Sequence, residues 1–163
     1  MNFMYYHSPA GILRVAENGK AITHIQWAGT QPAPAETAQE PTPLLREAAR
    51  QLSEYFAGQR RTFDLPLAPQ GTAFQLRTWQ ALREIPYGQT RSYKQVAEAI
   101  GCPKGARAVG GANNRNPVSI LTPCHRVIGA DGRPVGYAGG LEAKKWLLAL
   151  EQSSAGDASS RNG

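Results

Sequence analysis

Residues 92–114 read SYKQVAEAIGCPKGARAVGGANN, and this segment indicates what kind of domain the second half of the chain forms. Its start, Ser92-Tyr93-Lys94-Gln95, has the spacing of a capping box, so a helix is predicted from Tyr93 to Ile100. After a glycine-containing turn, a second helix is predicted from Lys104 to Asn114, and Pro117 prevents it from continuing. Two short helices joined by such a turn match the helix-turn-helix plan.

The second of these helices is almost bare of side chains, and Arg107 is the one long side chain among its small residues. Against a nucleic acid, a bare helix could approach the backbone closely while Arg107 enters a groove. The alternative is a helix packed tightly on another helix, with Arg107 in solvent. The residues alone favour neither interpretation. The small residues are Gly105, Ala106, Ala108, Gly110, Gly111 and Ala112.

An apolar run from Ile120 to Ile128 is interrupted by Pro123-Cys124-His125-Arg126. Burying such polar groups costs free energy that structure alone rarely justifies. Cys124 is therefore either a small buried hydrophobe or a nucleophile with His125 as its base. On this pair alone the first interpretation is favoured, because free cysteine is among the most buried residue types.

The first half of the chain predicts antiparallel strands followed by a helix. Asn18-Gly19, placed between two apolar alternating runs, is a strong hairpin signal. Residues 29–42 are rich in proline and polar residues and predict a loop. The predicted strands are Phe3–His7, Ile12–Ala16 and Ala21–Trp27, and the predicted helices begin at Thr42-Pro43 and Thr72 and end at Gly58 and Glu84.

The end of the chain is less regular. A glycine-containing turn predicts a small hairpin between Val127-Ile128 and Arg133-Pro134-Val135. Residues 136–140 form a glycine-rich loop without the spacing of a phosphate-binding loop. A last helix is predicted over Leu141–Glu151, and the polar residues 152–163 predict a disordered tail.

Composition limits the class of protein. The 163 residues suffice for one compact unit or for two small ones that share an interface. Eighteen Lys and Arg against twelve Asp and Glu give a net charge of +6, which makes an anionic partner plausible. Cys102 and Cys124 form no disulfide or metal-binding pattern. No apolar run approaches the roughly 20 residues that cross a bilayer, so a cytoplasmic protein with no membrane partner is expected.

Six motifs in order strongly resemble the O6-alkylguanine-DNA alkyltransferases, from about Thr72 to Glu151. The resemblance implies an α/β (α+β) fold. Residues 1–70, which resemble the family only in overall pattern, are expected to form a ribonuclease H-like domain of antiparallel strands and a helix. Residues 71–151 are expected to form a winged helix-turn-helix domain. The motifs are Ser92-Tyr93, Ala106-Arg107-Ala108-Val109-Gly110-Gly111-Ala112, Asn116-Pro117-Val118, Pro123-Cys124-His125-Arg126-Val127, Gly136-Tyr137-Ala138-Gly139-Gly140 and Lys144-Lys145-Trp146-Leu147-Leu148.

The resemblance implies a DNA repair protein that binds double-stranded DNA through the minor groove. It implies that an O6-alkylated guanine, or an O4-alkylated thymine, is flipped out of the stack and gives its alkyl group to Cys124. A thiol with a pKa of about 8.5 needs help to ionise at neutral pH. In the family that help comes from His125, which acts through a water and is oriented by Glu151, while Asn116 steadies the turn and the thiol. Because the thioether formed has no easy route back, each molecule is expected to act once.

The same resemblance implies roles in recognising DNA and the flipped base. Arg107 is expected to fill the position that the base leaves. Tyr93 is expected to lie near the 3′ phosphate and to donate a proton to the leaving guanine. The small residues Ala106, Ala108, Gly110 and Ala112 let the helix enter the groove. The guanine pocket is expected to contain the backbone carbonyls of Cys124 and Val127, the side chains of Tyr137 and Lys144, and Ala138.

The sequence also departs from relatives that hold a structural zinc ion with N-terminal Cys and His ligands. Residues 1–70 contain no cysteine, so neither a metal nor a cofactor is expected. Asn113 and Ala138 stand where relatives can have an apolar residue and a serine, which leaves the preferred size of the alkyl group open. A monomer is expected, with cooperativity on DNA left open. Two rival functions remain: a non-catalytic lesion-binding module, and a Cys-His hydrolase that turns over repeatedly.

Overall fold

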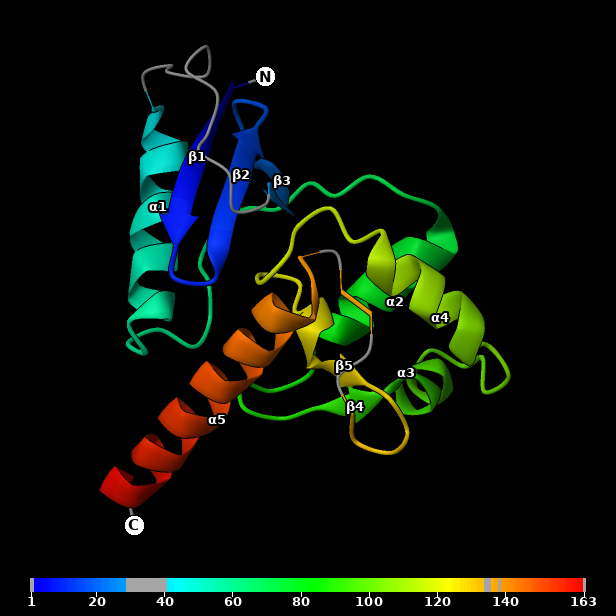
Figure 1. Ribbon diagram of the computed structural model, residues 1–163. Coiled ribbons are helices and arrows are strands. Elements are labelled where there is room, and N and C mark those ends of the chain that lie inside the picture. The colour runs from blue at the N-terminus through cyan, green and yellow to red at the C-terminus, as the bar shows by residue number, and fades with distance from the viewer. Residues whose placement is uncertain (1, 29–40, 134–135, 138, 163) are drawn as a thin grey trace.

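The computed structural model describes residues 2–28, 41–133, 136–137 and 139–162, with side chains up to residue 154. Two parts lie side by side in Figure 1: a three-stranded sheet covered by one helix, and a group of short helices. The last helix begins between them. The loop predicted over residues 29–42 falls almost wholly outside the described residues. None of the described helices has the length and apolar character needed to cross a membrane.

The sheet contains β1 (Asn2–Ser8), β2 (Gly11–Glu17) and β3 (Ile22–Trp27), all antiparallel and in that order. The strands agree with the predicted ones to within two residues at each end. The turn between β2 and β3 forms as expected, because the Asn18 side chain accepts hydrogen bonds from Lys20 N and Ala21 N and Gly19 adopts a φ of 94°.

Helix α1 (Pro43–Phe56) lies along one face of the sheet (Figure 1). Thr42 caps it by accepting a hydrogen bond from Leu45 N at 3.2 Å. Its buried face is apolar, as the sequence predicted, apart from Gln51, and it forms a core with the inner side chains of β2 and β3. Members of this core include Leu13, Val15, Ile22, Ile25, Leu45, Leu52 and Tyr55.

The helical part contains α2 (Ala73–Arg83), α3 (Tyr93–Ala99) and α4 (Ala106–Asn114). Both predicted capping boxes are present, at Thr72 with Gln75 and at Ser92 with Gln95. The three helices surround a second apolar core. Its buried members are Trp79, Leu82, Ile85, Val96, Ala97, Val109, Cys124 and Val127.

Edge strand β3 joins the two parts. Ile25 N donates to Pro117 O at 2.8 Å, and Ser119 N donates to Ile25 O at 2.9 Å. The segment that leads to Cys124 is therefore hydrogen-bonded to the N-terminal sheet. This contact is between residues far apart in sequence, and no local pattern predicts it.

Strand β5 (Val127–Ile128) pairs in parallel with β4 (Arg91–Ser92), a pairing that the sequence did not predict. The hairpin predicted between Val127-Ile128 and Arg133-Pro134-Val135 can be followed only in part. The turn itself forms, with Gly129 N bonded to Arg133 O at 2.8 Å, but residues 134–135 lie outside the described part.

Helix α5 (Leu141–Asn162) continues past Glu151, where the sequence analysis ended it and predicted a disordered tail. That prediction is wrong for the backbone of residues 152–162. The added residues contain no proline, and extending an existing helix is easier than starting one, because each further residue adds a hydrogen bond without a new nucleus.

Candidate active site

Cys124 lies in a short 3-10 helix, η2 (Cys124–Arg126), that follows a sharply turned segment. Asn116 fixes this segment through both ends of its amide. Its Nδ2 donates to Thr122 O at 2.7 Å, and its Oδ1 accepts from Val118 N at 3.0 Å. Asn116 thus closes a loop whose far end carries the thiol.

Within this loop, Ile120 has a φ of 74°. This left-handed conformation is a clear outlier for a β-branched residue and costs on the order of 1–3 kcal/mol. The Ile120 side chain is only 2% exposed and packs into the core beneath the sheet, so burial offsets the strain. The loop is therefore held by packing in a shape that brings Cys124 into the second core.

Cys124 itself is 3% exposed. Burial raises the pKa of its thiol, while hydrogen bonds with the Asn116 and Ser119 side chains and the positive charge of Lys144 lower it in part. The net direction is upward, so the thiol is protonated at rest. Ionisation needs a base close by.

His125 is that neighbouring base, and it is fully buried. Its Nε2 lies 2.6 Å from Glu151 Oε2, whereas its Nδ1 has no hydrogen-bond partner among the described residues. Burial lowers the pKa of His125, and the Glu151 carboxylate opposes this shift. A neutral imidazole that donates from Nε2 to Glu151 keeps Nδ1 as a free acceptor.

Glu151, at the centre of α5, is hydrogen-bonded to three side chains of the site. Arg126 donates to it twice, from Nε to Oε1 at 2.7 Å and from Nη2 to Oε2 at 3.0 Å. Tyr55 of α1 donates its hydroxyl to Oε2 at 2.5 Å. Burial raises the pKa of Glu151, but the Arg126 and His125 contacts outweigh it, and its net pKa lies well below the usual range. Because His125 is neutral, we attribute the ionised state mainly to Arg126.

Sequence reasoning missed Arg126 and Tyr55. Arg126 is buried, and a guanidinium inside an apolar run needs a buried carboxylate partner. That requirement was the available signal, although it did not identify which carboxylate is the partner. Tyr55 carried no such signal, because its hydroxyl lies on an otherwise apolar helix face and its partner is 96 residues away.

Lys144 is fully buried and close enough to the thiol to interact with it electrostatically. Its Nζ donates to Val127 O at 2.6 Å and to Gly136 O at 3.3 Å. Burial lowers the pKa of Lys144 to about 8, and the nearby Cys124 opposes this shift. Asn113 Nδ2 donates to Cys124 O at 3.3 Å, so both carbonyls expected in the guanine pocket are fixed by side chains.

Tyr93 and Tyr137 are partly buried and close enough to Cys124 to interact with it electrostatically. Burial is the main cause of the raised pKa of each. The Tyr93 ring also packs over α4, because a Cβ on Gly110 would lie 3.8 Å from it. Any larger side chain than glycine or alanine there would push the ring away. Ala138 lies outside the described residues.

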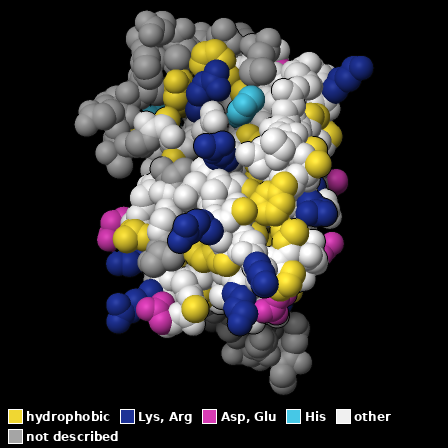
Figure 2. Space-filling model, turned by 90° about the vertical axis from the view of Figure 1, so that its right-hand side faces the viewer, with side chains coloured by type: hydrophobic (Ala, Val, Ile, Leu, Met, Phe, Trp, Pro, Cys, Tyr) yellow, Lys and Arg dark blue, Asp and Glu magenta, His cyan; other side chains and the backbone are white. Residues whose placement is uncertain are grey.

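Arg107 projects from α4 and is exposed, as is Ala108, while Ala106 and Gly110 are partly buried. Of the two interpretations left open for this helix, packing against other helices applies to one of its sides. Val109 and Ala112 pack on α2 and α3, and the opposite side is open to solvent. Figure 2 shows that on this side of the molecule Lys and Arg side chains are spread across the surface, with Asp and Glu mostly toward its edges.

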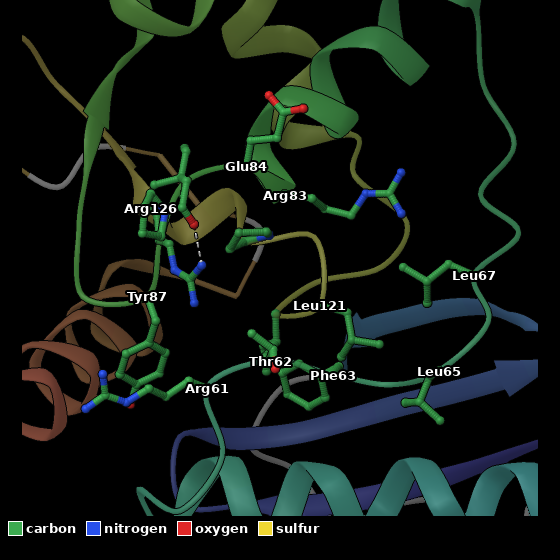
Figure 3. Close-up of a pocket in the computed structure, with 14 residues that line it drawn as sticks. Arg61, Thr62, Phe63, Leu65, Leu67, Arg83, Glu84, Tyr87, Leu121 and Arg126 are labelled. Carbon is green, nitrogen blue, oxygen red and sulfur yellow. Dashed lines mark hydrogen bonds between the residues drawn. The ribbon is translucent and has the colours of Figure 1, made fainter. Parts of the chain in front are cut away.

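A separate cavity of about 370 Å³ lies where the two parts meet (Figure 3). It is lined by Arg61 and Phe63 from the N-terminal part, by Arg83 and Tyr87 from the helical part, and by Arg126. Arg126 reaches across to donate to Ile85 O at 2.8 Å. Neither Cys124 nor Tyr93 nor Tyr137 lines this cavity, so it is distinct from the space around the thiol.

These features define a helix-turn-helix protein with a cysteine-centred site, in which a thiol, an imidazole and a carboxylate are all buried. Two family models match the chain: "6-O-methylguanine DNA methyltransferase, ribonuclease-like domain" over residues 1–69, and "6-O-methylguanine DNA methyltransferase, DNA binding domain" over residues 73–153. The chain belongs to the 6-O-methylguanine DNA methyltransferase family. The resemblance seen in the sequence and the fold class that it implied are confirmed.

Relatives match over nearly the whole chain. A methylated-DNA–protein-cysteine methyltransferase of Methanosarcina barkeri is 50% identical over 93% of this chain and 99% of its own length. A constitutive enzyme of the same name from Bacillus subtilis is 48% identical, over 90% of this chain and 93% of its own. The crystal structure of Mycobacterium tuberculosis OGT in complex with DNA is 44% identical, with a TM-score of 0.83 and 94% of each chain covered.

Proposed function

We propose that this protein repairs DNA by moving the alkyl group of O6-alkylguanine, and of O4-alkylthymine, irreversibly to its own Cys124. One observation carries the proposal. In a chain of this family, the buried Cys124 follows directly on the fixed loop, and its neighbour His125 is hydrogen-bonded to an ionised Glu151. A nucleophile, a base and a group that orients the base are the parts that nucleophilic catalysis needs.

The proposed reaction is a nucleophilic displacement at a saturated carbon. The thiol proton passes to His125 Nδ1 through a water, and the sulfur attacks the alkyl carbon attached to O6. The S–C bond forms as the C–O bond breaks, and Tyr93 gives its hydroxyl proton to the departing guanine. Lys144 and Asn113 hold the backbone of the pocket in place through Val127 O and Cys124 O. The stable thioether ends the activity of the molecule.

Helix α4 is the element that binds DNA. We propose that its exposed side lies in the minor groove, where Ala106, Ala108 and Gly110 allow close approach. Arg107 occupies the place of the flipped base, which offsets part of the cost of unstacking. The basic side chains in Figure 2 are suited to the phosphates, and binding should weaken as salt rises. The protein acts as a monomer.

The test is the intact mass of the protein after incubation with duplex DNA that contains O6-methylguanine. One methyl adduct per molecule is expected, located on Cys124. The Cys124→Ser variant should show no adduct but bind the DNA as well as before, and Cys102→Ser, which removes the other free thiol, should react normally.

Other outcomes identify the rival functions. Tight binding of the lesion with an unchanged mass would indicate a non-catalytic binding module. Repaired guanine in excess of one equivalent per protein would indicate a hydrolase that turns over. Equal loss of binding and transfer in Cys124→Ser would contradict the role of Cys124 as the acceptor.

A further inference from the structure

Trp27 is the last residue of β3, in the N-terminal sheet, but it contacts the loop that follows η2 in the other half of the chain. Its indole Nε1 donates to the hydroxyl of Tyr137 at 3.0 Å, across 110 residues of sequence. The two rings also meet edge to face, with centroids 6.1 Å apart. The family resemblance places Tyr137 in the expected guanine pocket, whereas Trp27 has no role in the proposed reaction.

Gly139 rests on the same indole. A Cβ at this position would lie 2.6 to 2.8 Å from Cγ, Cδ1 and Cδ2 of Trp27. Carbon atoms do not approach that closely, and these ring atoms are nearest the backbone, where the side chain has little freedom to move. The absence of a side chain therefore lets the loop backbone lie directly against Trp27, so that the indole holds the loop at two points.

Trp27 is itself well placed to act as a support. Two residues before it, Ile25 is hydrogen-bonded to Pro117 O and Ser119 N, on the segment that leads to Cys124. The same strand thus fixes both the thiol segment and the glycine-rich loop. A loop of this composition has little conformational preference of its own, so a rigid neighbour has to hold it.

We propose that Trp27 is a positioning residue for the base pocket, which holds the loop so that the Tyr137 ring faces the flipped base. This inference rests on the proposed function and deepens it. Trp27 touches no reacting atom and acts through Tyr137 and Gly139. Its removal should weaken capture of the base and leave the transfer step itself unchanged.

The experiment is single-turnover labelling with free O6-benzylguanine over a range of concentrations. This substrate separates the half-saturating concentration from the limiting rate of transfer and needs no DNA. Trp27→Phe removes the N–H donor and part of the indole but keeps an aromatic ring, and Trp27→Ala removes the aromatic ring altogether. Loss of one hydrogen bond should raise the half-saturating concentration about three- to tenfold, with a larger rise for Trp27→Ala, while the limiting rate stays within about twofold.

Two controls separate positioning from general damage. Trp146→Phe alters another indole where the two halves meet, packed on Phe56 with ring centroids 5.5 Å apart, and should change neither constant. Reaction of Cys124 with iodoacetamide should stay within about twofold in all variants, because Asn116, Ser119 and Lys144, which lower the pKa of the thiol, are not substituted.

A second variant tests the contact with Gly139. Gly139→Ala alone should weaken base capture, because its methyl group would collide with the indole. In the Trp27→Ala background the same change should have no further effect, since the colliding ring is gone. Such coupling is specific to direct contact, and a structural role elsewhere would not produce it.

The outcomes are distinct. A fall in the limiting rate with an unchanged half-saturating concentration would overturn the inference, as would independent, additive effects of Trp27→Ala and Gly139→Ala. If the wild-type protein labels normally and both Trp27 variants match it, only this inference fails. If the wild-type protein forms no adduct with either substrate, the proposed function fails, and this inference with it.

Discussion

Glu151 accepts hydrogen bonds from the side chains of Tyr55, His125 and Arg126, and its carboxylate is 0% exposed to solvent. A buried ion pair adds little stability compared with apolar packing, but breaking it is costly, because the remaining charge stays buried. Glu151→Gln would leave the buried Arg126 guanidinium without the negative charge of this carboxylate.

We expect Glu151→Gln to lower the free energy of unfolding by about 3–5 kcal/mol. The folded-state pKa of Glu151 is held below its ordinary 4.5, so the folded protein binds fewer protons than the unfolded chain in acid. Its stabilising contribution is complete above pH 4.5 and is lost as the pH falls further. Urea unfolding from pH 7 to pH 3 should therefore show a weaker acid dependence in Glu151→Gln than in the wild type. Glu98→Gln, which removes a carboxylate at an exposed position of α3, should follow the wild type.

The charge of Lys144 leads to a second testable prediction. Its ammonium group lowers the pKa of the Cys124 thiol, and its own pKa is about 8. Lys144→Met should slow labelling by free benzylguanine about three- to tenfold at pH 7. Because wild-type Lys144 loses its charge as the pH rises through about 8, the difference between the two proteins should narrow at higher pH. Lys145→Met, at the exposed neighbouring position, is the control, and a constant difference at all pH values would contradict the electrostatic role.

At the scale of elements, α4 has one packed side and one open side, and Arg107 lies on the open one. Arg107→Ala should reduce repair of duplex DNA by about tenfold or more, because no long side chain then fills the position that the flipped base leaves in the stack. Labelling by free benzylguanine should stay within about twofold, because no base has to be flipped. Lys20→Ala removes one exposed positive charge from the β2–β3 turn and controls for net charge. Equal losses with both substrates would mean that Arg107 supports the fold.

Local patterns predicted the elements well. Thr72 and Ser92 begin their helices as expected, because a capping box needs only neighbouring residues. The pairing of β4 with β5 and the contacts of Glu151 could not be predicted in this way, since they join residues far apart in the chain. The strained Ile120 was also beyond local reasoning, because its propensity opposes the conformation that core packing imposes.

On the scale of the whole molecule, the two parts share one buried polar network. Tyr55 in α1 reaches Glu151 in α5, and Arg126 reaches the carbonyl of Ile85. Strand β3 is hydrogen-bonded to the segment before Cys124. We therefore expect the two parts to unfold together, in one transition.

Tyr55→Phe tests this coupling. Losing a hydrogen bond to a buried charged group should lower the free energy of unfolding by about 1.5–3 kcal/mol. Tyr87→Phe is a matched control, because the buried Tyr87 hydroxyl has no partner among the described residues, and its removal should be neutral or stabilising. Thermal unfolding followed by both far-UV circular dichroism and tryptophan fluorescence should give coincident curves for the wild type. Curves that separate would show that the two parts unfold independently.

The deep burial of Cys124 has a further consequence for a side chain that reacts only once. Such a residue has to stay chemically intact until its substrate arrives. Soluble oxidants attack thiolates that they can reach, and Cys124 is both protonated at rest and 3% exposed. Cys102, in the turn between α3 and α4, is more accessible and meets such oxidants first. Burial therefore shields the unused thiol from soluble oxidants until the substrate arrives.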